Sequence, residues 1–524
     1  MTDAAKEHYV KLTALAVLSV VIVMGNFFWQ GHDGFNLWDE GYLWYGAKQI
    51  LAGEIPLRDF MAYDPGRYYW AASYFSLIGD TGIIALRASV AVFQVFGLYA
   101  GLWTISLTLR KVNFFNMFYL CVAAATLMAW AYPRHKIFDI SISMIVVAGL
   151  AYFLRAPSVK RYFLLGIMVG LVAVFGRNHG VYGALACFLA FAWLMVKSPL
   201  NNTQWKGLAV WVGGVIVGYV PVIAMCIFTP GYFKAFFDTI LFMLQQGNTN
   251  LPLPIPWPWT VGFGTAGVLI ETRWFLIGIC FIALIVFGVG TLIWAFNQRL
   301  RGHYVRPELV AAACCGVPYA HYAFARADVG HLAQAIYPLL LGTFIILATC
   351  SFQYLKWLSA LAMAVLSVFI LADWQPGALA RSKPGWTVLT ISGSKLSVDP
   401  STAEAINLLR DLTARYAQDG RSVLVLPFWP GAYPLLDRRA PLWEIYALSP
   451  RSDDFQRAEI ERIKKADPGY ALVFDVPMDG REELKYSNSH PLIDNYIRTH
   501  FEAFPNTVST ALLTYKSVDV DSSR

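Results

Sequence analysis

Charge is scarce in this sequence. Only 14% of its 524 residues are Asp, Glu, Lys or Arg, whereas 57% are hydrophobic and the mean hydropathy is +0.49. Soluble proteins carry about 25% charged residues, so this composition excludes an ordinary soluble enzyme. The net charge of +7 is modest. Much of it lies in short loops between apolar runs, which indicates membrane topology rather than nucleic-acid binding.

Cysteine is also rare, and no cysteine lies where water would reach it. All seven lie inside apolar runs, which excludes a disulfide framework and a cysteine-based metal site in exposed regions. They are Cys121, Cys187, Cys226, Cys280, Cys314, Cys315 and Cys350. The sequence likewise shows no internal repeat and no inverted-repeat pattern of a secondary transporter.

The few charges are unevenly placed along the chain. Residues 1–373 hold 38 of them and residues 374–524 hold 37. The first part is therefore about a tenth charged and the second about a quarter, which is the ordinary soluble value. We expect a membrane-spanning body over 1–373, followed by a water-soluble domain over 374–524 that is long enough to bury its own core.

Eleven apolar runs in the body are long enough for membrane helices, which need about 20 residues. They lie near 9–29, 84–109, 114–131, 138–154, 162–176, 181–196, 208–229, 274–296, 308–325, 332–350 and 353–373. No small-residue cleavage site follows the first run, so it is interpreted as an uncleaved helix. The expected fold class is an α-helical polytopic membrane protein with about eleven transmembrane helices and a C-terminal soluble α/β domain.

Basic residues alternate between the two sides that these spans define. Thirteen fall in the small loops of one side: Lys6, Lys11, Arg110, Lys111, Arg155, Lys160, Arg161, Lys197, Lys206, Arg299, Arg301, Arg306 and Lys356. The short loops of the other side hold only Arg134, Lys136, Arg177 and Arg326. The positive-inside rule then predicts a multi-pass protein of the cytoplasmic membrane, with a cytoplasmic N-terminus and a periplasmic or extracytoplasmic C-terminal domain. Most acidic residues of the body fall on the outer side, where we expect the chemistry.

Two outer loops are long, over 30–83 and 230–272. The first carries helix-like stretches rich in Tyr and Trp, which are typical of helices in the membrane interface. The second contains LPLPIPWPWT, which cannot form a regular helix. This run lines the mouth of a cavity or is simply an interfacial loop, and composition favours the loop.

The C-terminal part alternates between helical and strand patterns. Helices are predicted over 401–420, 455–469 and 490–504, and strands over 422–428, 470–476 and 510–516, which suggests a small three-layer α/β domain. It has no GxGxxG, no P-loop and no triad-like pattern, so no catalytic role is assigned to it.

The richest stretch of polar residues follows the first span. It reads WDEGYLWYGAKQILAGEIPLRDF and continues with YDPGRYYWAASYFSLIG. This stretch resembles the first outer loop of the GT-C superfamily of membrane glycosyltransferases, and is similar to the group containing protein O-mannosyltransferases and the lipid A aminoarabinose transferase. The motif match covers residues 36–80, and the expected architecture of the chain is similar too.

The resemblance implies a glycosyltransferase that takes a sugar from a polyprenyl-phosphate donor, since nucleotide sugars are absent outside the cytoplasmic membrane. It implies Asp39 as the base that takes the acceptor proton. Glu40 would orient Asp39 or bind a divalent cation (Mg, Mn or Ca) with it, and Asp64 would be a second carboxylate of the same pocket. The alternative reading of Asp39 is that it caps the following helix.

Basic residues in the outer loops are candidates for binding the donor phosphate. The candidate substrate-binding residues are Arg67, Arg134, Lys136, Arg177, His179, Arg326 and His331. The loop cations could instead pair with the acids of 30–83 and hold the outer face together. His135, His179 and His331 could be metal ligands, but no HxH or HExxH spacing supports this, which favours hydrogen-bonding histidines.

Together these patterns predict a hexosyl- or pentosyltransferase of the cell envelope that works with inversion at the anomeric carbon. Its partners would be the polyprenyl-phosphate sugar, membrane lipid and a lipid, glycan or protein acceptor, with no nucleic acid. A lipid-linked glycan polymerase or ligase would share outer-face Arg and His chemistry. A transporter or flippase of lipid-linked sugars would place ionisable residues near mid-membrane, whereas here they lie at loop edges.

Overall fold

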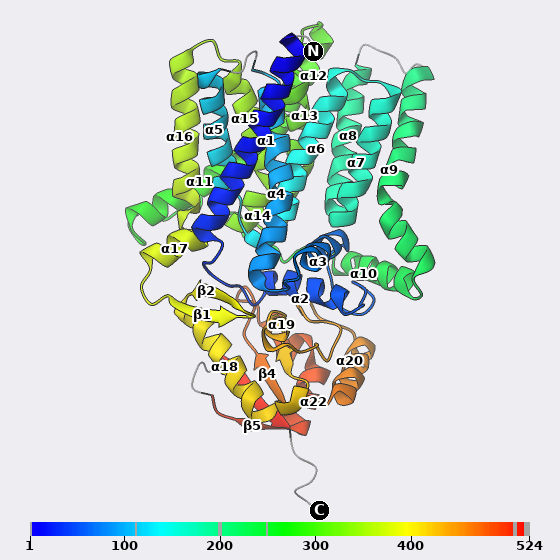
Figure 1. Ribbon diagram of the computed structural model, residues 1–524, viewed down its shortest axis with the longest axis vertical. Coiled ribbons are helices and arrows are strands. Elements are labelled where there is room, and N and C mark those ends of the chain that lie inside the picture. The colour runs from blue at the N-terminus through cyan, green and yellow to red at the C-terminus, as the bar shows by residue number, and fades with distance from the viewer. Residues whose placement is uncertain (1–2, 110–112, 197–201, 248–249, 507–510, 518–524) are drawn as a thin grey trace, which may run out of the picture. The chain divides into compact units, whose positions relative to one another are not determined.

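The computed structural model describes residues 3–109, 113–196, 202–247, 250–506 and 511–517 (Figure 1). Its contacts divide the chain into two compact units. The helical unit comprises Met1–Gly31, Ala88–Pro230 and Gly247–Leu379, and the mixed unit comprises His32–Arg87, Gly231–Gln246 and Ala380–Arg524. The mixed unit thus joins the C-terminal part to most of the first predicted outer loop and to a piece of the second.

Apolar helices build the helical unit, and each of the eleven predicted spans falls on one helix or on two consecutive ones. These are α1 (Asp3–Gln30), α4 (Ile83–Ser106), α5 (Phe114–Ala129), α6 (Ile137–Arg155), α7 (Val159–Phe175), α8 (Arg177–Met195), α9 (Asn202–Phe228), α11 (Val268–Ile285) with α12 (Thr291–Arg301), α13 (Pro307–Ala325), α14 (Val329–Ala335) with α15 (Tyr337–Ala348), and α16 (Gln353–Leu371). Among the described residues, seven helices can cross a membrane by length and composition, or eight if α14 and α15, bent by 50°, form one span. The other predicted spans lie on the shorter α5 and α7 and on α13, which contains Glu308 and His321.

Contacts within the helical unit show that α4 and α6 both run in the direction opposite to α1. At one end, the Lys11 ammonium at the start of α1 donates to the carbonyl of Ser106 at the end of α4 (2.5 Å). At the other end, Arg134 before α6 donates to the carbonyl of Gln30, the last residue of α1 (2.8 Å). These directions are what the predicted topology requires, and the assignment of one end to the cytoplasm stays a prediction. Arg110, Lys111 and Lys197, which that prediction also uses, lie outside the described residues.

Glycines allow α7 and α9 to pack backbone against backbone, side by side in Figure 1. Gly166 and Gly170 on α7 face Gly214 and Gly218 on α9. A Cβ atom at any of these four positions would approach backbone atoms of the other helix to within 3.0 Å. This is the small-residue spacing that lets membrane helices approach closely.

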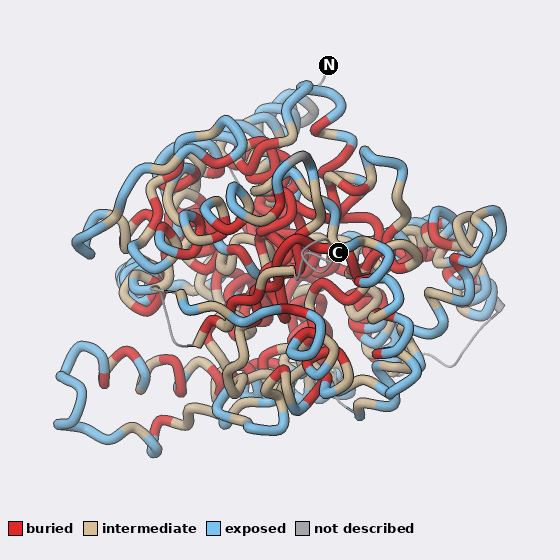
Figure 2. Tube along the Cα trace, turned by 90° about the horizontal axis from the view of Figure 1, so that it is seen from below, coloured by how far each residue is buried: buried red, intermediate tan, exposed pale blue. Residues whose placement is uncertain are grey.

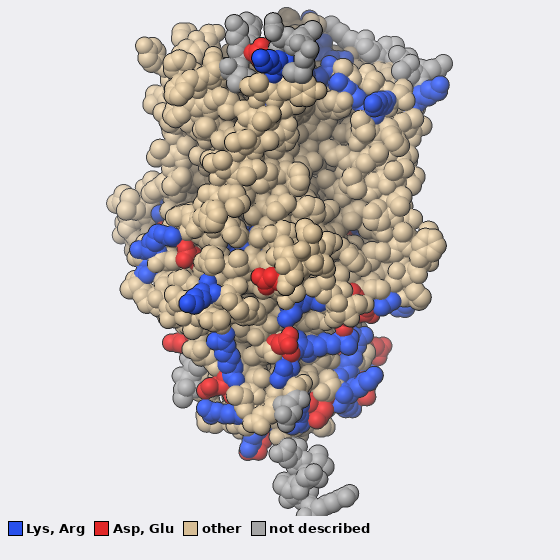
Figure 3. All heavy atoms as spheres, viewed as in Figure 1, with Lys and Arg blue, Asp and Glu red and all other residues tan. Residues whose placement is uncertain are grey.

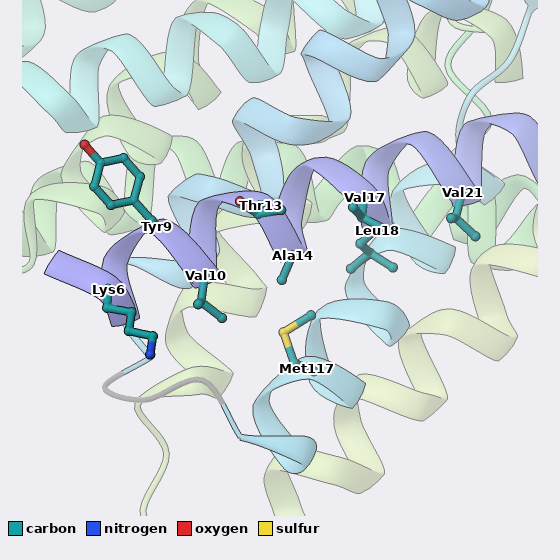
Figure 4. A pocket seen from close by; sticks show the side chains of 9 residues that line it. All are labelled: Lys6, Tyr9, Val10, Thr13, Ala14, Val17, Leu18, Val21 and Met117. Carbon is teal, nitrogen blue, oxygen red and sulfur yellow. The ribbon is translucent and has the colours of Figure 1, made fainter. Parts of the chain in front are cut away.

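Apolar side chains cover the outside of the helical unit. On the face shown in Figure 3, a broad band without Lys, Arg, Asp or Glu crosses its helices. A groove of about 690 Å³ between α1 and α5 is lined by Lys6, Tyr9, Val10, Thr13, Ala14, Val17, Leu18, Val21 and Met117 (Figure 4). None of these is a predicted site residue. The groove therefore belongs to the apolar surface of the spans and not to the candidate site.

A four-stranded sheet forms the centre of the mixed unit, with strand order β3-β4-β6-β5. Its strands are β3 (Leu424–Leu426), β4 (Tyr470–Phe474), β5 (Phe501–Phe504) and β6 (Leu512–Ser517); β3 runs parallel to β4, and the other neighbours are antiparallel. The helices of this segment are α17 (Pro376–Ser382), α18 (Pro400–Tyr416), α19 (Ala432–Leu436), α20 (Asp453–Ala466), α21 (Tyr486–Ser489) and α22 (Pro491–His500). All the predicted C-terminal helices and strands are present.

Two details of this segment differ from the prediction. The helix predicted over 490–504 ends at His500, because Phe501–Phe504 pairs with β6 as an additional strand. A hairpin of β1 (Thr387–Ile391) and β2 (Ser394–Val398), which was not predicted, adds to the unit. Ser397 in β2 exchanges backbone hydrogen bonds with His32 and Gly34, so the hairpin holds the start of the first loop segment.

Three helices outside the C-terminal segment complete the mixed unit: α2 (Asp39–Leu51), α3 (Gly66–Ile78) and α10 (Tyr232–Gln246). The location of the helices of the first loop in the membrane interface stays a prediction, but most of their aromatic rings are buried within the mixed unit. Tyr42, Trp44, Tyr45 and Tyr68 are at most 2% exposed, and buried residues are drawn red in Figure 2. Their polar atoms find partners inside the unit, as the Trp44 indole does on the Thr81 carbonyl (2.8 Å), so burying these large rings is favourable.

Candidate functional site

Asp39 is the first residue of α2, and its position raises the question of whether it serves only as a helix cap. The side-chain oxygen of Asn36 accepts hydrogen bonds from the backbone amides of Trp38 (2.8 Å) and Asp39 (2.9 Å). Asn36 thus satisfies donors that a helix start leaves open. Asp39 itself directs a carboxylate oxygen to the phenol of Tyr446, which donates to it at 2.8 Å.

A cluster of tyrosines links Asp39 to the second motif, YDPGR. The ring of Tyr42, one turn after Asp39, lies 5.3 Å from the ring of Tyr446 and 4.8 Å from that of Tyr63. Tyr63 precedes Asp64, and the guanidinium of Arg67 lies 5.0 Å from the centre of the Tyr63 ring. The fold therefore brings the two motifs of the first loop together around these rings.

Asp64 and Arg67 are both buried, with 8% and 4% of their surfaces exposed. Buried charges of this kind are expensive unless they are paired, and they concentrate at functional sites. The tyrosines around them stay protonated, because burial raises the pKa of Tyr42 and of Tyr68 well above the ordinary value. They can therefore act as hydrogen-bond donors at neutral pH.

Glu40 has a different environment from its neighbour Asp39. Its two oxygens accept hydrogen bonds from Arg87 at 2.7 and 2.8 Å, and the same guanidinium donates to the carbonyl of Gly34 (2.6 Å). The side chains of Glu40 and Arg87 are 6% and 2% exposed. This bidentate, buried pair anchors the start of α2 to the start of α4.

The donor set does not fit a bound divalent cation. Mg²⁺ and Ca²⁺ take six or more oxygen ligands, whereas both oxygens of Glu40 already face a guanidinium. Across the part of the chain that the structure describes, no group of three or more His, Cys, Asp or Glu side chains could hold a metal ion. We derive no chemical step through a metal.

His179 lies in a buried polar network of the helical unit. One ring nitrogen contacts Asp139 in the first turn of α6 (2.7 Å), and the other contacts the Tyr319 hydroxyl on α13 (3.0 Å). The side chains of His179 and Asp139 are 1% and 2% exposed. An ionisable pair inside a membrane protein indicates a functional site, and this network agrees with the expectation of a hydrogen-bonding histidine.

Arg326 and His331 meet on one carboxylate. Arg326 pairs with Asp328 at 2.9 Å, and a nitrogen of His331 lies 2.9 Å from the other Asp328 oxygen. Arg326 also donates to the carbonyl of Leu251 (3.1 Å), and His331 contacts the side chain of Asn250 (2.6 Å). This cluster ties the start of the Pro/Trp segment to the α13–α14 turn.

The structure places the remaining candidates at helix starts of the same unit. Arg134 and Lys136 form a short 3-10 turn before α6, and Arg177 opens α8. The two units thus carry separate sets: the mixed unit holds Asp39, Glu40, Asp64 and Arg67, and the helical unit holds Arg134, Lys136, Arg177, His179, Arg326 and His331.

Sequence reasoning missed three residues of these networks. Asp139 was visible only as one of many outer-side acids. Arg87 lies inside an apolar run, where a lone arginine is a signal that could have been used. Tyr446 carries no sequence signal, because it is one of many tyrosines and lies far from Asp39 along the chain.

The fold can now be classed. A unit of many apolar helices, joined to an α/β unit that also contains the loop after the first helix, is the architecture of a polytopic membrane protein.

The solved structures that this chain matches agree with that class. The crystal structure of ArnT from Cupriavidus metallidurans bound to undecaprenyl phosphate superposes with a TM-score of 0.55, at 12% sequence identity, over 98% of this chain and 98% of that chain. The same protein in the apo state gives a TM-score of 0.53, at 12% identity, over 98% and 99%. This chain shares the fold of ArnT.

Other comparisons add nothing to this. The archaeal oligosaccharyltransferase AglB from Archaeoglobus fulgidus, in complex with an inhibitory peptide and a dolichol-phosphate, gives a TM-score of 0.46, at 12% identity, over 97% of this chain and 74% of that chain. A score of that size supports no conclusion. No protein-family model matches the sequence, and no curated protein matches it.

Proposed function

We propose that the chain is a membrane glycosyltransferase that moves a sugar from a polyprenyl-phosphate donor to a hydroxyl of a lipid, glycan or protein acceptor. The observation that carries this proposal is the carboxylate of Asp39, which opens α2 within the WDEGY motif and is held by Tyr446 rather than used as the helix cap. The fold shared with ArnT, which was solved with undecaprenyl phosphate bound, supports a lipid-linked donor.

In this reaction Asp39 accepts the proton of the acceptor hydroxyl. The hydroxyl oxygen forms the new bond to the anomeric carbon as the bond from that carbon to the phosphate oxygen breaks, so the configuration inverts. The leaving polyprenyl phosphate keeps the electron pair of the broken bond. Its negative charge needs cationic donors, which are worth most in a site that excludes water.

The proposed cationic donors are the candidates that the sequence predicts: Arg67, Arg134, Lys136, Arg177 and Arg326. His179 and His331 would bind the donor or orient these cations through Asp139 and Asp328. Glu40 acts through its ion pair with Arg87 by fixing the first turn of α2, and Asp64 stays a proposed second carboxylate of the pocket.

We also propose that the site faces the outer side of the cytoplasmic membrane. The support is the excess of basic residues in the loops at the end of the helical unit where α1 starts, together with the positive-inside rule. Lipid-linked sugars are the donors present on that outer side.

The proposal is tested by transfer from a panel of radiolabelled polyprenyl-phosphate sugars, with the purified protein in nanodiscs and membrane extract as acceptor. We expect the native chain to transfer one of them and Asp39→Asn to lose about 100- to 10,000-fold, the contribution of a general base. Asp80→Asn is the matched control, since Asp80 is an exposed acid of the same segment that accepts the Gly82 amide.

Three outcomes separate the possibilities. Transfer that is lost in Asp39→Asn and kept in Asp80→Asn supports the reaction class and the base together. Transfer that survives Asp39→Asn would keep the enzyme and move the base. No transfer from any donor would overturn the proposal and favour a polymerase, ligase or flippase of lipid-linked sugars.

A further inference from the structure

A segment of the C-terminal part reaches the candidate base. Residues 440–451, which we call the strap, connect the region after α19 to the region before α20. Tyr446 lies in the middle of the strap, is partly buried, and donates its phenol hydrogen to Asp39 at 2.8 Å. Asp39 is partly exposed as well, so this contact lies where an acceptor hydroxyl can approach.

Buried charges hold the strap in place from the side of the C-terminal core. One oxygen of Glu459 on α20 accepts the backbone amides of Trp443 (2.7 Å) and Glu444 (3.1 Å). Glu444 in turn pairs with Arg451 (2.6 Å) and His490 (2.9 Å). The Glu444, Arg451 and His490 side chains are at most 8% exposed.

Such a network is costly to bury and rigid once all its members are paired. The proposed reaction uses none of these charged groups directly. Their common effect is to fix the backbone on both sides of Tyr446.

The strap is also fastened to the loop that carries the two motifs. The Trp443 indole donates to the Leu57 carbonyl (3.0 Å), and the Met61 amide donates to the Trp443 carbonyl (2.9 Å). The Ala440 amide donates to the hydroxyl of Tyr45 (3.2 Å). The strap is therefore held to the same segment on which Asp39 lies, and the position of Tyr446 relative to Asp39 is set from two sides.

A carboxylate that acts as a base must keep one oxygen aimed at the proton it takes. Rotation of the carboxylate about the Cβ–Cγ bond would otherwise spread that oxygen over several orientations. Small displacements of a catalytic group are costly to catalysis. The phenol of Tyr446 donates to Oδ1 of Asp39. This contact fixes the orientation of the carboxylate, so that Oδ2 has a defined direction for the acceptor hydroxyl.

We propose that Tyr446 is a positioning residue for Asp39, and that the C-terminal segment completes the candidate catalytic site through the strap. This inference rests on the proposed function. It gives a role to a segment in which the sequence shows no catalytic motif.

The experiment compares Tyr446→Phe, Asp39→Asn and the double variant in the full-length protein, with kcat and KM measured for the polyprenyl-phosphate sugar that the native chain uses. Tyr470→Phe is the matched control, because its hydroxyl contacts Thr413 inside the C-terminal core (3.1 Å). The melting temperature of each variant shows whether it folds.

We expect Tyr446→Phe to lower kcat by about 10- to 100-fold, the effect of losing one hydrogen bond to a charged group, with KM changed by less than about twofold. Tyr470→Phe should keep the native kcat. The double variant should be no slower than Asp39→Asn alone, because Tyr446 acts through Asp39.

A native kcat in Tyr446→Phe, or a raised KM at unchanged kcat, would overturn the inference while leaving the proposed function standing. A double variant that multiplies the two single losses would also overturn it, because the loss would then not pass through Asp39. Absence of transfer by the native chain would instead overturn the proposed function, and the inference with it.

Discussion

The close packing of α7 and α9 makes a sharp prediction for two adjacent glycines of α9. A Cβ at Gly214 would lie 3.0 Å from the Ile167 nitrogen and 3.1 Å from the Gly166 Cα, and still closer to the Phe163 carbonyl oxygen. A Cβ at Gly213 would meet nothing within 4 Å. Alanine should therefore be excluded at one position and accepted at the next, although both lie on the same helix.

The expected magnitudes follow from these distances. At Gly213, alanine stabilises the helix by up to about 1 kcal/mol, because glycine is the poorer helix former. At Gly214, the obstructing atoms are backbone atoms, which cannot rotate away, so Gly214→Ala should cost about 1–3 kcal/mol through forced separation of the helices. The two variants should thus differ by about 1–4 kcal/mol.

Thermal unfolding in detergent measures the difference, and the variants control for each other. A gap of that size corresponds to roughly 2–16 °C in melting temperature, at the 2–4 °C per kcal/mol of domains of about 150–250 residues. Because membrane proteins often unfold irreversibly, both variants must be heated at the same rate. Equal melting temperatures for Gly213→Ala and Gly214→Ala would refute the close backbone contact.

Three further predictions concern ionisable groups of the mixed unit. Glu40→Gln or Arg87→Met should each lower the melting temperature, because breaking a buried pair costs about 3–5 kcal/mol. The double variant Glu40→Met with Arg87→Met should cost less than either single change. A stable but inactive Glu40→Gln would instead make Glu40 catalytic. Burial opposes ionisation of Asp399 at the N-cap of α18, but hydrogen bonds from Ser401 and Thr402 outweigh it and lower the pKa of Asp399. The Asp399 carboxylate contributes to stability above the ordinary carboxyl pKa, and this contribution is lost as pH falls through the lowered pKa. Asp399→Ala should therefore cost about 1 kcal/mol at pH 7. In acid, the variant and the native chain should have the same melting temperature. Burial raises the pKa of Glu459, so its contribution to stability is lost as pH rises through the raised pKa. Melting curves should therefore show Glu459→Gln gaining on the native chain as the pH rises above the ordinary carboxyl range.

Much of the fold could be predicted because its signals are local. Apolar length alone located the long helices of the helical unit, as for the run that became α1. In the C-terminal part, a strand pattern located β4 and helical periodicity located α20 in the same way. The end of α22 at His500 could not be predicted, because the next residues have helical periodicity and become a strand only by pairing with β6.

The candidate site was predictable only in part, for the same reason. Asp39 and Asp64 are visible because they lie in motifs within one loop. The partner of Glu40 is Arg87, and a sequence does not show which of many acids a lone arginine will meet. The burial of the aromatic rings was also not predicted, since Tyr and Trp suit both a membrane interface and a protein core with polar partners.

The hydrogen bond between Tyr446 and Asp39 joins residues 407 positions apart. At translation rates of about 5–20 residues per second, the candidate base is synthesised roughly 20–80 s before the residue that orients it. The loop that carries Asp39 must wait in a partly assembled state while nearly all the later helices are made. The order of synthesis thus leaves Asp39 without the residue that orients it until Tyr446, in the last quarter of the sequence, has been made.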